Sequence, residues 1–173
     1  SAVSLSTIFG YELNILHSSD EDKQKMRQQI VFYKSIRHIV EQGEFYRLKS
    51  PFHGEEAAWM FVTSTKDEAY FTYFVMRKEC NVPNRRLVKL QGLDENAHYS
   101  IENGYNSSIN QNSVTGIFSG HLLMNAGYRL PSFNGDCQAY SCVLRKIEHP
   151  RETIVFSEPP SPAQVVIDSQ RIA

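Results

Sequence analysis

The fold class of this chain is decided by residues 18–49, SSDEDKQKMRQQIVFYKSIRHIVEQGEFYRLK. Apolar side chains recur in it at steps of three and four, which predicts an amphipathic helix from about Asp20 to Gln42. Ser18 and Glu21 have the spacing of a capping box, which marks the start of that helix. Gly43 is expected to end it in a left-handed conformation. The apolar stripe is broad enough to predict packing against more than one neighbour: it comprises Met26, Ile30, Phe32, Tyr33, Ile36, Ile39 and Val40.

Beyond Gly43 the hydrophobic period becomes two, and short β-rich runs alternate with turn residues. This spacing predicts a mainly β fold, an antiparallel β-sandwich of the Greek-key type preceded by one long N-terminal α-helix. Two runs, 57–62 and 70–76, are apolar on both faces and are expected to be central or covered by a helix. The predicted strands are 45–49, 57–63, 69–77, 86–90, 98–102, 114–118, 122–124 and 138–146.

Along strand 138–146, residues expected to be buried alternate with residues expected to be partly exposed. Its residues Tyr140, Cys142 and Leu144 are expected to face the core. Ser141, Val143 and Arg145 are expected on a face that is at least partly wet. Four prolines then interrupt the residues from His149 onward, so these are interpreted as a tail.

Composition excludes several classes of protein. The 173 residues carry a formal net charge of −1, which argues against nucleic acid or an anionic membrane as partner. The hydrophobic fraction of 41% predicts a folded chain, and no run is long enough to span a bilayer. The absence of a secretion signal and the scattered Cys80, Cys137 and Cys142 favour a reducing, cytoplasmic location over a disulfide framework.

Local signatures of catalysis are missing from the sequence. It has no Gly-x-Ser-x-Gly elbow and no glycine-rich phosphate loop, and its six histidines lack metal-type spacing, so neither metal nor cofactor is expected. The adjacent acids are interpreted as solvated turn residues: Glu55 with Glu56, Asp67 with Glu68, and Asp94 with Glu95. Trp59 is a weak candidate for stacking on a sugar, although its apolar neighbours favour core packing.

A series of short motifs, in this order, resembles the C-terminal end of bacterial α-galactosidases of glycoside hydrolase family 36. The resemblance covers roughly Ile8 to Ile147, and its motifs are individually weak but specific as a series. They are FGYELN (9–14), IVFYK (30–34), GEFYRL (43–48), SPFHG (50–54), AWM (58–60), LQGLD (90–94) and LMNAG (123–127).

The resemblance implies a parent enzyme that is longer than this chain and contains a catalytic TIM barrel. Residues 1–43 would then be the terminal helical segment of that barrel, 44–148 a C-terminal antiparallel β-sandwich domain, and 149–173 a proline-containing tail. In the family, the nucleophilic aspartate follows a Lys-Trp pair, and the acid/base aspartate lies in a later Ser-Asp-Asp motif. Trp59 is followed by Met60 and no Asp-Asp pair occurs, so no catalytic residue is assigned, and Glu12 is interpreted as structural.

The main hypothesis is therefore a non-catalytic C-terminal portion of an α-galactosidase whose parent releases terminal galactose from melibiose- or raffinose-type oligosaccharides with retention. Its expected partner is the barrel of the parent, and a homo-oligomer is compatible with the apolar stripe. Two alternatives stay open from the residues alone. One is an autonomous carbohydrate-binding module, suggested by the aromatic content of 12%, and the other is an oligomerisation module.

Overall fold

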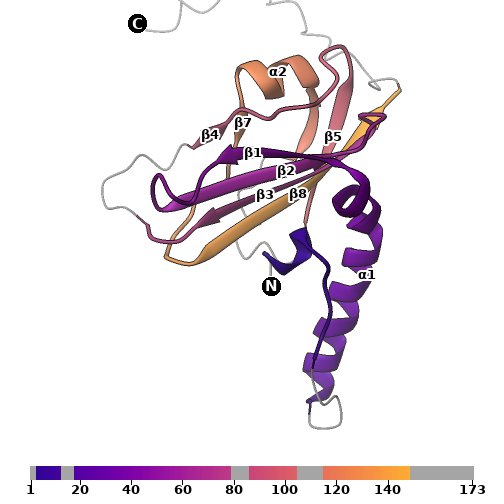
Figure 1. Cartoon of the computed structure of the whole chain (residues 1–173), viewed down its shortest axis with the longest axis vertical. Coiled ribbons are helices and arrows are strands. Elements are labelled where there is room, and N and C mark those ends of the chain that lie inside the picture. Colours follow the sequence, from indigo (N-terminus) through magenta and orange to yellow (C-terminus); the bar gives the residue numbers. More distant parts are fainter. Residues whose placement is uncertain (1–2, 13–17, 79–85, 105–114, 149–173) are drawn as a thin grey trace, which may run out of the picture.

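A computed structural model describes residues 3–12, 18–78, 86–104 and 115–148. A 3-10 turn, η1 (Ser4–Ser6), precedes the long helix α1 (Asp20–Gln42), and the remaining elements are mainly strands (Figure 1). The predicted fold class is thereby confirmed. The strands are β1 (Glu44–Lys49), β2 (Glu56–Val62), β3 (Glu68–Val75), β4 (Leu87–Val88), β5 (His98–Asn103), β6 (Gly116–Ser119), β7 (Tyr128–Arg129) and β8 (Gln138–Ile147).

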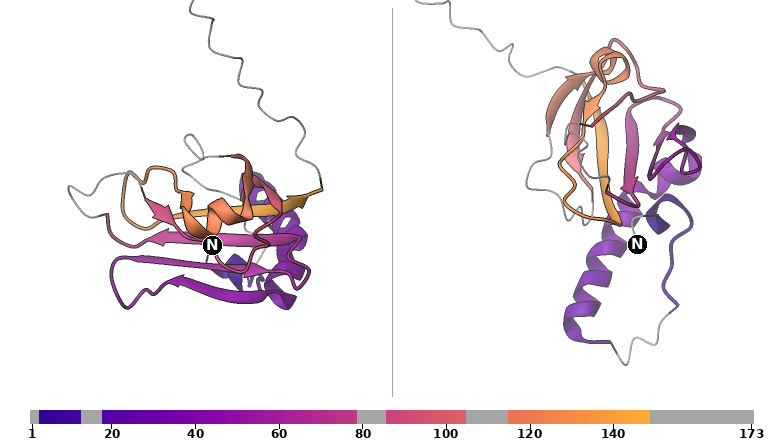
Figure 2. Two further views of the ribbon diagram at one scale, coloured as in Figure 1. Left: turned by 90° about the horizontal axis from the view of Figure 1, so that it is seen from above. Right: turned by 90° about the vertical axis from the view of Figure 1, so that its left-hand side faces the viewer.

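Within the described residues the strands form two antiparallel sheets. The larger has six strands in the order β1-β2-β3-β8-β5-β6, and the smaller pairs β4 with β7. The short helix α2 (Gly120–Asn125) follows β6 directly. Figure 2 shows the two sheets as layers with α1 at one end of the larger sheet. The runs that are apolar on both faces became β2 and β3, adjacent strands that also contact α1.

The main core lies between the large sheet and the layer formed by β4, β7 and α2. Alternate residues of the central strands point into it and are fully buried, including Met60, Phe71 and Tyr140. From the opposite layer come Leu90, Leu123, Tyr128, Leu130 and Phe133. The expectation that Tyr140, Cys142 and Leu144 face the core is correct. Burial raises the pKa of the Cys142 thiol to about 12, so it packs as a neutral apolar group.

A second core covers part of the opposite face of the sheet. There Leu5, Ile36 and Ile39 pack against Phe61, Tyr70 and Val143. The sequence-based expectation of a wet face on β8 was wrong at Ser141 and Val143, which are 2% and 3% exposed. The reason is tertiary: η1 and α1 come from the start of the chain and cover this face.

Helix α1 begins and ends where the sequence predicted, although the details of both ends differ. Ser19, rather than Ser18, is the N-cap, and its Oγ accepts a hydrogen bond from the Asp22 backbone N–H at 3.1 Å. At the other end Gly43 is extended, with φ −77° and ψ 158°, so the predicted left-handed end was wrong. Glycine is still required, because a Cβ there would lie 2.3 Å from the Ile39 carbonyl oxygen.

Residues 122–124 were predicted as a strand and belong to helix α2 instead. Ser119 caps this helix, with its Oγ accepting a hydrogen bond from the Leu122 backbone N–H at 3.2 Å. A short apolar run does not by itself distinguish a strand from a buried helical turn. None of the helices in the described residues is both long enough and apolar enough to cross a bilayer. The predicted tail, 149–173, lies outside the described residues, and the proposed domain boundaries stay predictions.

Candidate functional site

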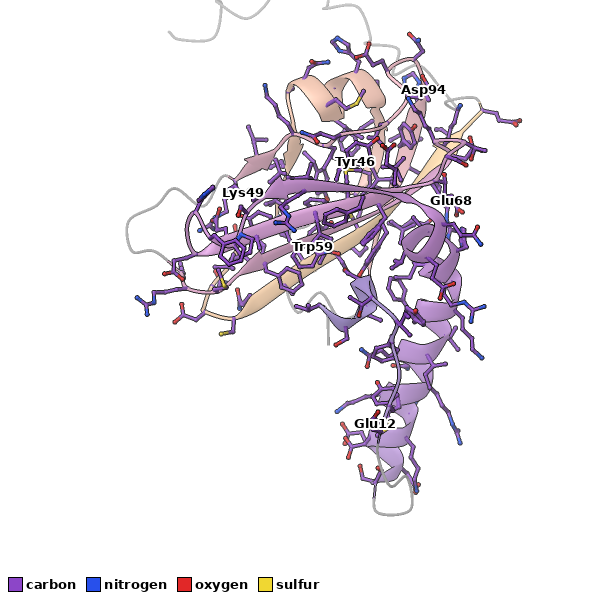
Figure 3. All side chains as sticks on the ribbon, in the orientation of Figure 1. Glu12, Tyr46, Lys49, Trp59, Glu68 and Asp94 are labelled. Carbon is purple, nitrogen blue, oxygen red and sulfur yellow. The ribbon has the colours of Figure 1, made fainter. Side chains whose placement is uncertain are left out.

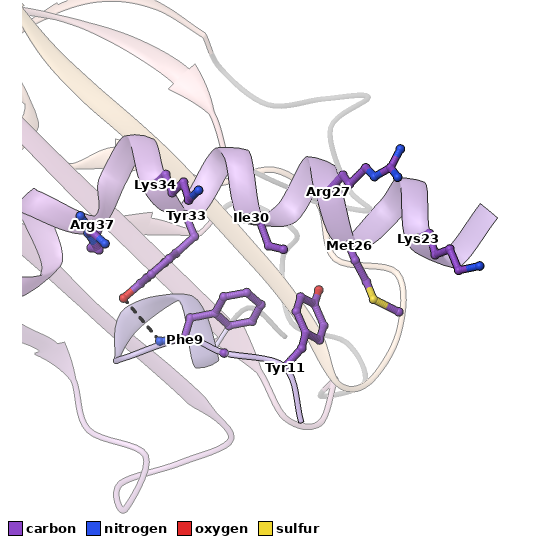
Figure 4. Close-up of a pocket in the computed structure, with 10 residues that line it drawn as sticks. Phe9, Tyr11, Lys23, Met26, Arg27, Ile30, Tyr33, Lys34 and Arg37 are labelled. Atoms are coloured by element: carbon purple, nitrogen blue, oxygen red, sulfur yellow. Dashed lines mark hydrogen bonds between the residues drawn. The ribbon is translucent and has the colours of Figure 1, made fainter. Parts of the chain in front are cut away.

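A hollow of about 570 Å³ lies between helix α1 and the N-terminal segment 9–11 (Figure 4). Its floor is apolar and aromatic, and its rim on the helix side is basic. The residues that line it are Phe9, Gly10, Tyr11, Lys23, Met26, Arg27, Ile30, Tyr33, Lys34 and Arg37.

Tyr33 holds the N-terminal segment beside the helix. Its hydroxyl donates a hydrogen bond to the Thr7 carbonyl oxygen at 3.1 Å and accepts one from the Phe9 backbone N–H at 3.4 Å. The Tyr11 hydroxyl donates to Gln29 Oε1, one helical turn away from Tyr33. The Phe9 ring contacts both tyrosines, with centroids 5.0 Å from Tyr11 and 5.4 Å from Tyr33. These contacts fix the geometry of the floor.

The two halves of α1 have different surroundings. The C-terminal half packs on the sheet, where Ile36 and Ile39 are fully buried. The N-terminal half extends beyond the sheet, as Figure 1 shows. Ile30 is 37% exposed and Val31 is 68% exposed, although both belong to the apolar part of the helix. Helix α1 therefore packs on the sheet over its C-terminal half only.

A second, shallower hollow lies on the other flank of the same half of α1. It is lined by Arg27, Gln28, Val31, Phe32 and Ser35. The helix thus has an apolar concavity on each flank, next to a basic outer face. A helix that stands between two neighbours in a layer has this kind of surface. We refer to the two hollows and the outer face between them as the open side of α1.

Glu56 has two cationic partners, Lys49 and Arg86, and this arrangement is structural. Its carboxylate contacts Lys49 Nζ and lies 2.5 Å from Arg86 Nε, and 21% of its side chain is exposed. Burial opposes ionisation, but hydrogen bonds from Lys49 and Arg86 outweigh it and hold the pKa of this carboxyl below its ordinary value. An acid kept ionised between two cations is unsuited to donate a proton.

Glu68 connects helix α1 to the sheet. Its carboxylate lies 2.5 Å from His38 Nε2 on the helix and 3.2 Å from Arg145 Nε on β8. Its side chain is 29% exposed. The interpretation of this residue as a free turn acid was incomplete, because the partners come from parts of the chain that are distant in sequence.

Asp67 and Asp94 lie on either side of the same ammonium group. Lys146 Nζ is 3.8 Å from Asp67 and 3.2 Å from Asp94. The Asn96 backbone N–H and Lys146 hold the pKa of the Asp94 carboxyl below its ordinary value. Both carboxylates are therefore satisfied by a surface cation, which is a structural arrangement.

Trp59 lies on β2, on the sheet face that also carries the second core (Figure 3). Its ring stacks on Phe74 of β3, with centroids 4.9 Å apart and an interplanar angle of 27°. This contact occupies one face of the indole, whereas a sugar platform needs ring faces that are open. Sugar stacking by Trp59 stays a prediction. Glu12, also labelled in Figure 3, is exposed beside the N-terminal end of α1.

Metal ligands do not gather anywhere in the described part of the chain: its His, Cys, Asp and Glu residues form no group of three suited to a metal ion. The hollow beside α1 was not predicted as a site from the residues. Its helix side could be recognised in the apolar stripe, but nothing local to Phe9 and Tyr11 shows that they contact Tyr33 and Gln29.

Comparison with known proteins identifies the family. Residues 56–144 match the glycosyl hydrolase family 36 C-terminal domain, and residues 1–43 match the melibiase family. The α-galactosidase AgaA of Geobacillus stearothermophilus is 44% identical over 134 residues, which are 78% of this chain and 17% of that protein. The bifunctional α-galactosidase/sucrose kinase AgaSK of Mediterraneibacter gnavus is 35% identical over 140 residues, 81% of this chain and 14% of that protein.

Solved structures agree with the sequence comparison. The α-galactosidase AgaB of G. stearothermophilus superposes with a TM-score of 0.73 at 40% identity, over 84% of this chain and 18% of that one. A variant of AgaA in complex with raffinose gives the same TM-score and identity over 84% of this chain and 19% of that one. The chain thus spans about a fifth of the length of these relatives. It belongs to glycoside hydrolase family 36 and matches the C-terminal part of the family's α-galactosidases.

Proposed function

We propose that this chain is the non-catalytic C-terminal portion of an α-galactosidase, with residues 1–43 completing the catalytic barrel and residues 44–148 forming the terminal sandwich domain. The observation that carries the proposal is the open side of α1, where apolar residues such as Ile30 and Val31 are exposed, whereas Ile36 and Ile39 of the same helix are fully buried against the sheet. The parent barrel would cover this surface. The share of the relatives that the chain spans, 17% of AgaA, leaves room for that barrel.

The substrate of the proposed parent follows from its relatives. AgaA variants have been crystallised in complex with raffinose and stachyose, so α-galactosyl oligosaccharides are the proposed substrate class. The chain's own contribution would be structural. It would bury part of the last helix of the barrel and connect that helix to the sheet through the contacts of Glu68 with His38 and Arg145. Lys49 and Arg86 hold Glu56 of this chain ionised, so it would not act as a general acid.

A chimeric enzyme tests the proposal. The matched C-terminal region of AgaA is replaced by this chain, and hydrolysis of a chromogenic α-galactoside is measured. We expect activity within about tenfold of AgaA, no activity of AgaA truncated before this region, and none of the chain alone. A chain that hydrolyses the substrate alone would contradict the non-catalytic role. A chimera that folds but stays at the level of truncated AgaA would contradict the structural role.

A Glu56→Gln substitution in the chimera separates structure from catalysis. Loss of a structural ion pair lowers thermal stability, whereas kcat per folded molecule stays unchanged. A general acid or nucleophile would instead lose kcat by a factor of about 100 or more. Glu95→Gln, an exposed acid, serves as the matched control.

A further inference from the structure

We propose that the part of the parent protein that covers the open side of α1 is an acidic, amphipathic segment, whose carboxylates pair with a basic stripe on this helix. The stripe consists of Lys23, Arg27, Lys34 and Arg37. The proposal rests on the proposed function, since it specifies the chemistry of the surface that would meet α1.

The four cations lie along one line of the helix. Together with Ile30 they are separated by steps of four, three, four and three residues, which keeps them on a single face. Figure 4 shows their side chains along the helix, with the aromatic floor of the hollow on the other side. A partner that fills the hollow and also covers the outer face of the helix would therefore contact this row of positive charge.

Within the part of the chain that the structure describes, only Lys23 of the stripe has an ion-pair partner. Lys23 Nζ lies 3.5 Å from Asp20, in the first turn. For Arg27, Lys34 and Arg37, no ion pair occurs within the described residues. Like charges three or four residues apart destabilise an isolated helix. The chain as a whole has a net charge of −1, so this is a local separation of charge rather than a basic protein.

The acids of α1 lie at its two ends, and Glu41 is the one in the last turn. Asp20, Glu21 and Asp22 lie in its first turn, where they complement the helix dipole. Glu21 is engaged by Lys25, at 2.6 Å. From Arg27 to Arg37 the outer face carries only basic and neutral residues. Within the described residues no carboxylate pairs with Arg27, Lys34 or Arg37, and we place their partner in the rest of the parent protein.

The shape of the surface selects a protein segment over other anions. The hollow beside the stripe has an apolar and aromatic floor that includes Phe9, Met26, Ile30 and Tyr33. An occupant has to supply apolar side chains to the floor and carboxylates to the rim, which is the pattern of an amphipathic acidic helix or strand. A nucleic acid offers phosphates without the apolar side chains.

The test compares two triple substitutions in the AgaA chimera. The first reverses the stripe, Arg27→Glu, Lys34→Glu and Arg37→Glu. The control reverses three exposed cations outside α1, Arg77→Glu, Lys89→Glu and Arg129→Glu, with the same change in net charge. The Tm of each chimera is measured at about 0.01 M and about 1 M salt, where the screening lengths are about 30 Å and about 3 Å. A neutral triple variant with Gln at the stripe is measured in parallel.

We expect the stripe reversal to lower the Tm of the chimera by about 4 °C or more at low salt, and by less than half of that at high salt. The Gln variant should lose less, and the control less than about 1 °C. In the isolated chain the stripe reversal should leave the Tm unchanged or raise it, because no partner carboxylate is present. A carboxyl-to-amine cross-linker of zero length should join Lys34 to an acid of the AgaA part.

Three outcomes would overturn the inference. The first is equal loss of Tm for the stripe and control variants in an active chimera, which leaves the proposed function intact. The second is a loss of Tm that does not depend on salt. The third is cross-linking of Lys34 to a second copy of this chain, together with a dimer of the isolated chain that the stripe reversal dissociates. An unaltered chimera without activity would instead contradict the proposed function.

Discussion

The two faces of the six-stranded sheet differ in how completely the chain covers them. One face is closed by β4, β7 and α2, and the core between these layers contains fully buried residues from every layer, among them Phe71, Leu123 and Phe133. Among the described residues, the other face is covered where Leu5 and the C-terminal half of α1 lie against it. Beyond that contact α1 continues with apolar residues exposed, such as Val31 at 68%.

This difference distinguishes residues that stabilise the isolated chain from residues that would contact the rest of the proposed parent. The closed core needs nothing from outside, so its substitutions should destabilise the isolated chain. The open side of α1 contributes little to the isolated chain, because side chains such as Ile30 are not yet buried. Its substitutions should matter only when the proposed parent is present. The following predictions test this separation.

The largest effect is expected from Phe71→Ala, in the closed core. Phe71 is fully buried on β3 and contacts the Tyr128 ring edge-to-face, with centroids 6.1 Å apart. Removing the ring should lower the free energy of unfolding by about 3–5 kcal/mol, measured by urea denaturation. Phe52→Ala is the control, because Phe52 is 85% exposed and should change stability by less than about 0.5 kcal/mol. Equal effects of the two substitutions would refute the closed-core assignment.

Two separate substitutions on α1 test the difference between its buried part and its open side. Ile36 is fully buried against the sheet, whereas Ile30 is 37% exposed on the open side. Both change to Ala within the same helix, so intrinsic helix propensity cancels in the comparison. We expect a loss of about 2–4 kcal/mol for Ile36→Ala and less than about 1 kcal/mol for Ile30→Ala in the isolated chain.

The same pair should behave differently in the AgaA chimera. There Ile30→Ala should approach the cost of Ile36→Ala, since both side chains would then be buried. Thermal unfolding of the four proteins, two isolated and two chimeric, gives the comparison. A cost of Ile30→Ala that is the same in both contexts would mean that the open side stays open.

A smaller effect is expected at the contact between β1 and the loop that precedes β5. Gly92 has φ +78°, and a Cβ there would lie 2.4 Å from Cε2 of the Tyr46 ring. Gly92→Ala should therefore cost about 1–3 kcal/mol, from backbone strain and from displacement of the ring. Gly10→Ala is the control, because nothing lies within 4 Å of its Cβ position. In the Tyr46→Ala background the cost should fall, because only the backbone strain remains.

Much of the fold could be predicted because its determinants are local. The helix 20–42 follows from a hydrophobic period and a cap, and strand 138–146 follows from alternation. One error occurred where a distant part of the chain decides the outcome, and another where a local helix cap competes with the β pattern. Val143 was expected to be partly wet and is buried by Leu5 and α1. Residues 122–124 were expected to be a strand, although Ser119 provides an N-cap that indicates a helix.

The candidate site was less predictable than the fold. The apolar stripe identified one wall of the hollow, including Met26, Ile30 and Tyr33. The other wall depends on the Tyr33 hydroxyl meeting Thr7 and Phe9, twenty-six and twenty-four residues earlier in the chain. Such contacts depend on tertiary geometry, which no local pattern encodes. The family resemblance supplied an expectation that the residues alone could not, namely that another part of a larger enzyme would pack against this helix.

The smallest effect concerns Glu56, which fastens the covering layer to the sheet through Arg86, the residue before β4. The pKa of Glu56 is held below its ordinary value of 4.5, so its ion pairs stabilise the fold above that pH and are lost as the pH falls through the lowered pKa. Glu56→Gln should therefore lower stability by about 1 kcal/mol at neutral pH. The difference from the unaltered chain should shrink as the pH falls below 4.5, which denaturation at several pH values would show. Glu95→Gln, at an exposed acid, should show neither the loss nor its pH dependence. Equal costs of Glu56→Gln at low and neutral pH would show that the ionised carboxylate does not hold this layer on the sheet. Packing of Arg86 over the Phe133 ring, 5.6 Å from its centroid, would then be the stronger contact.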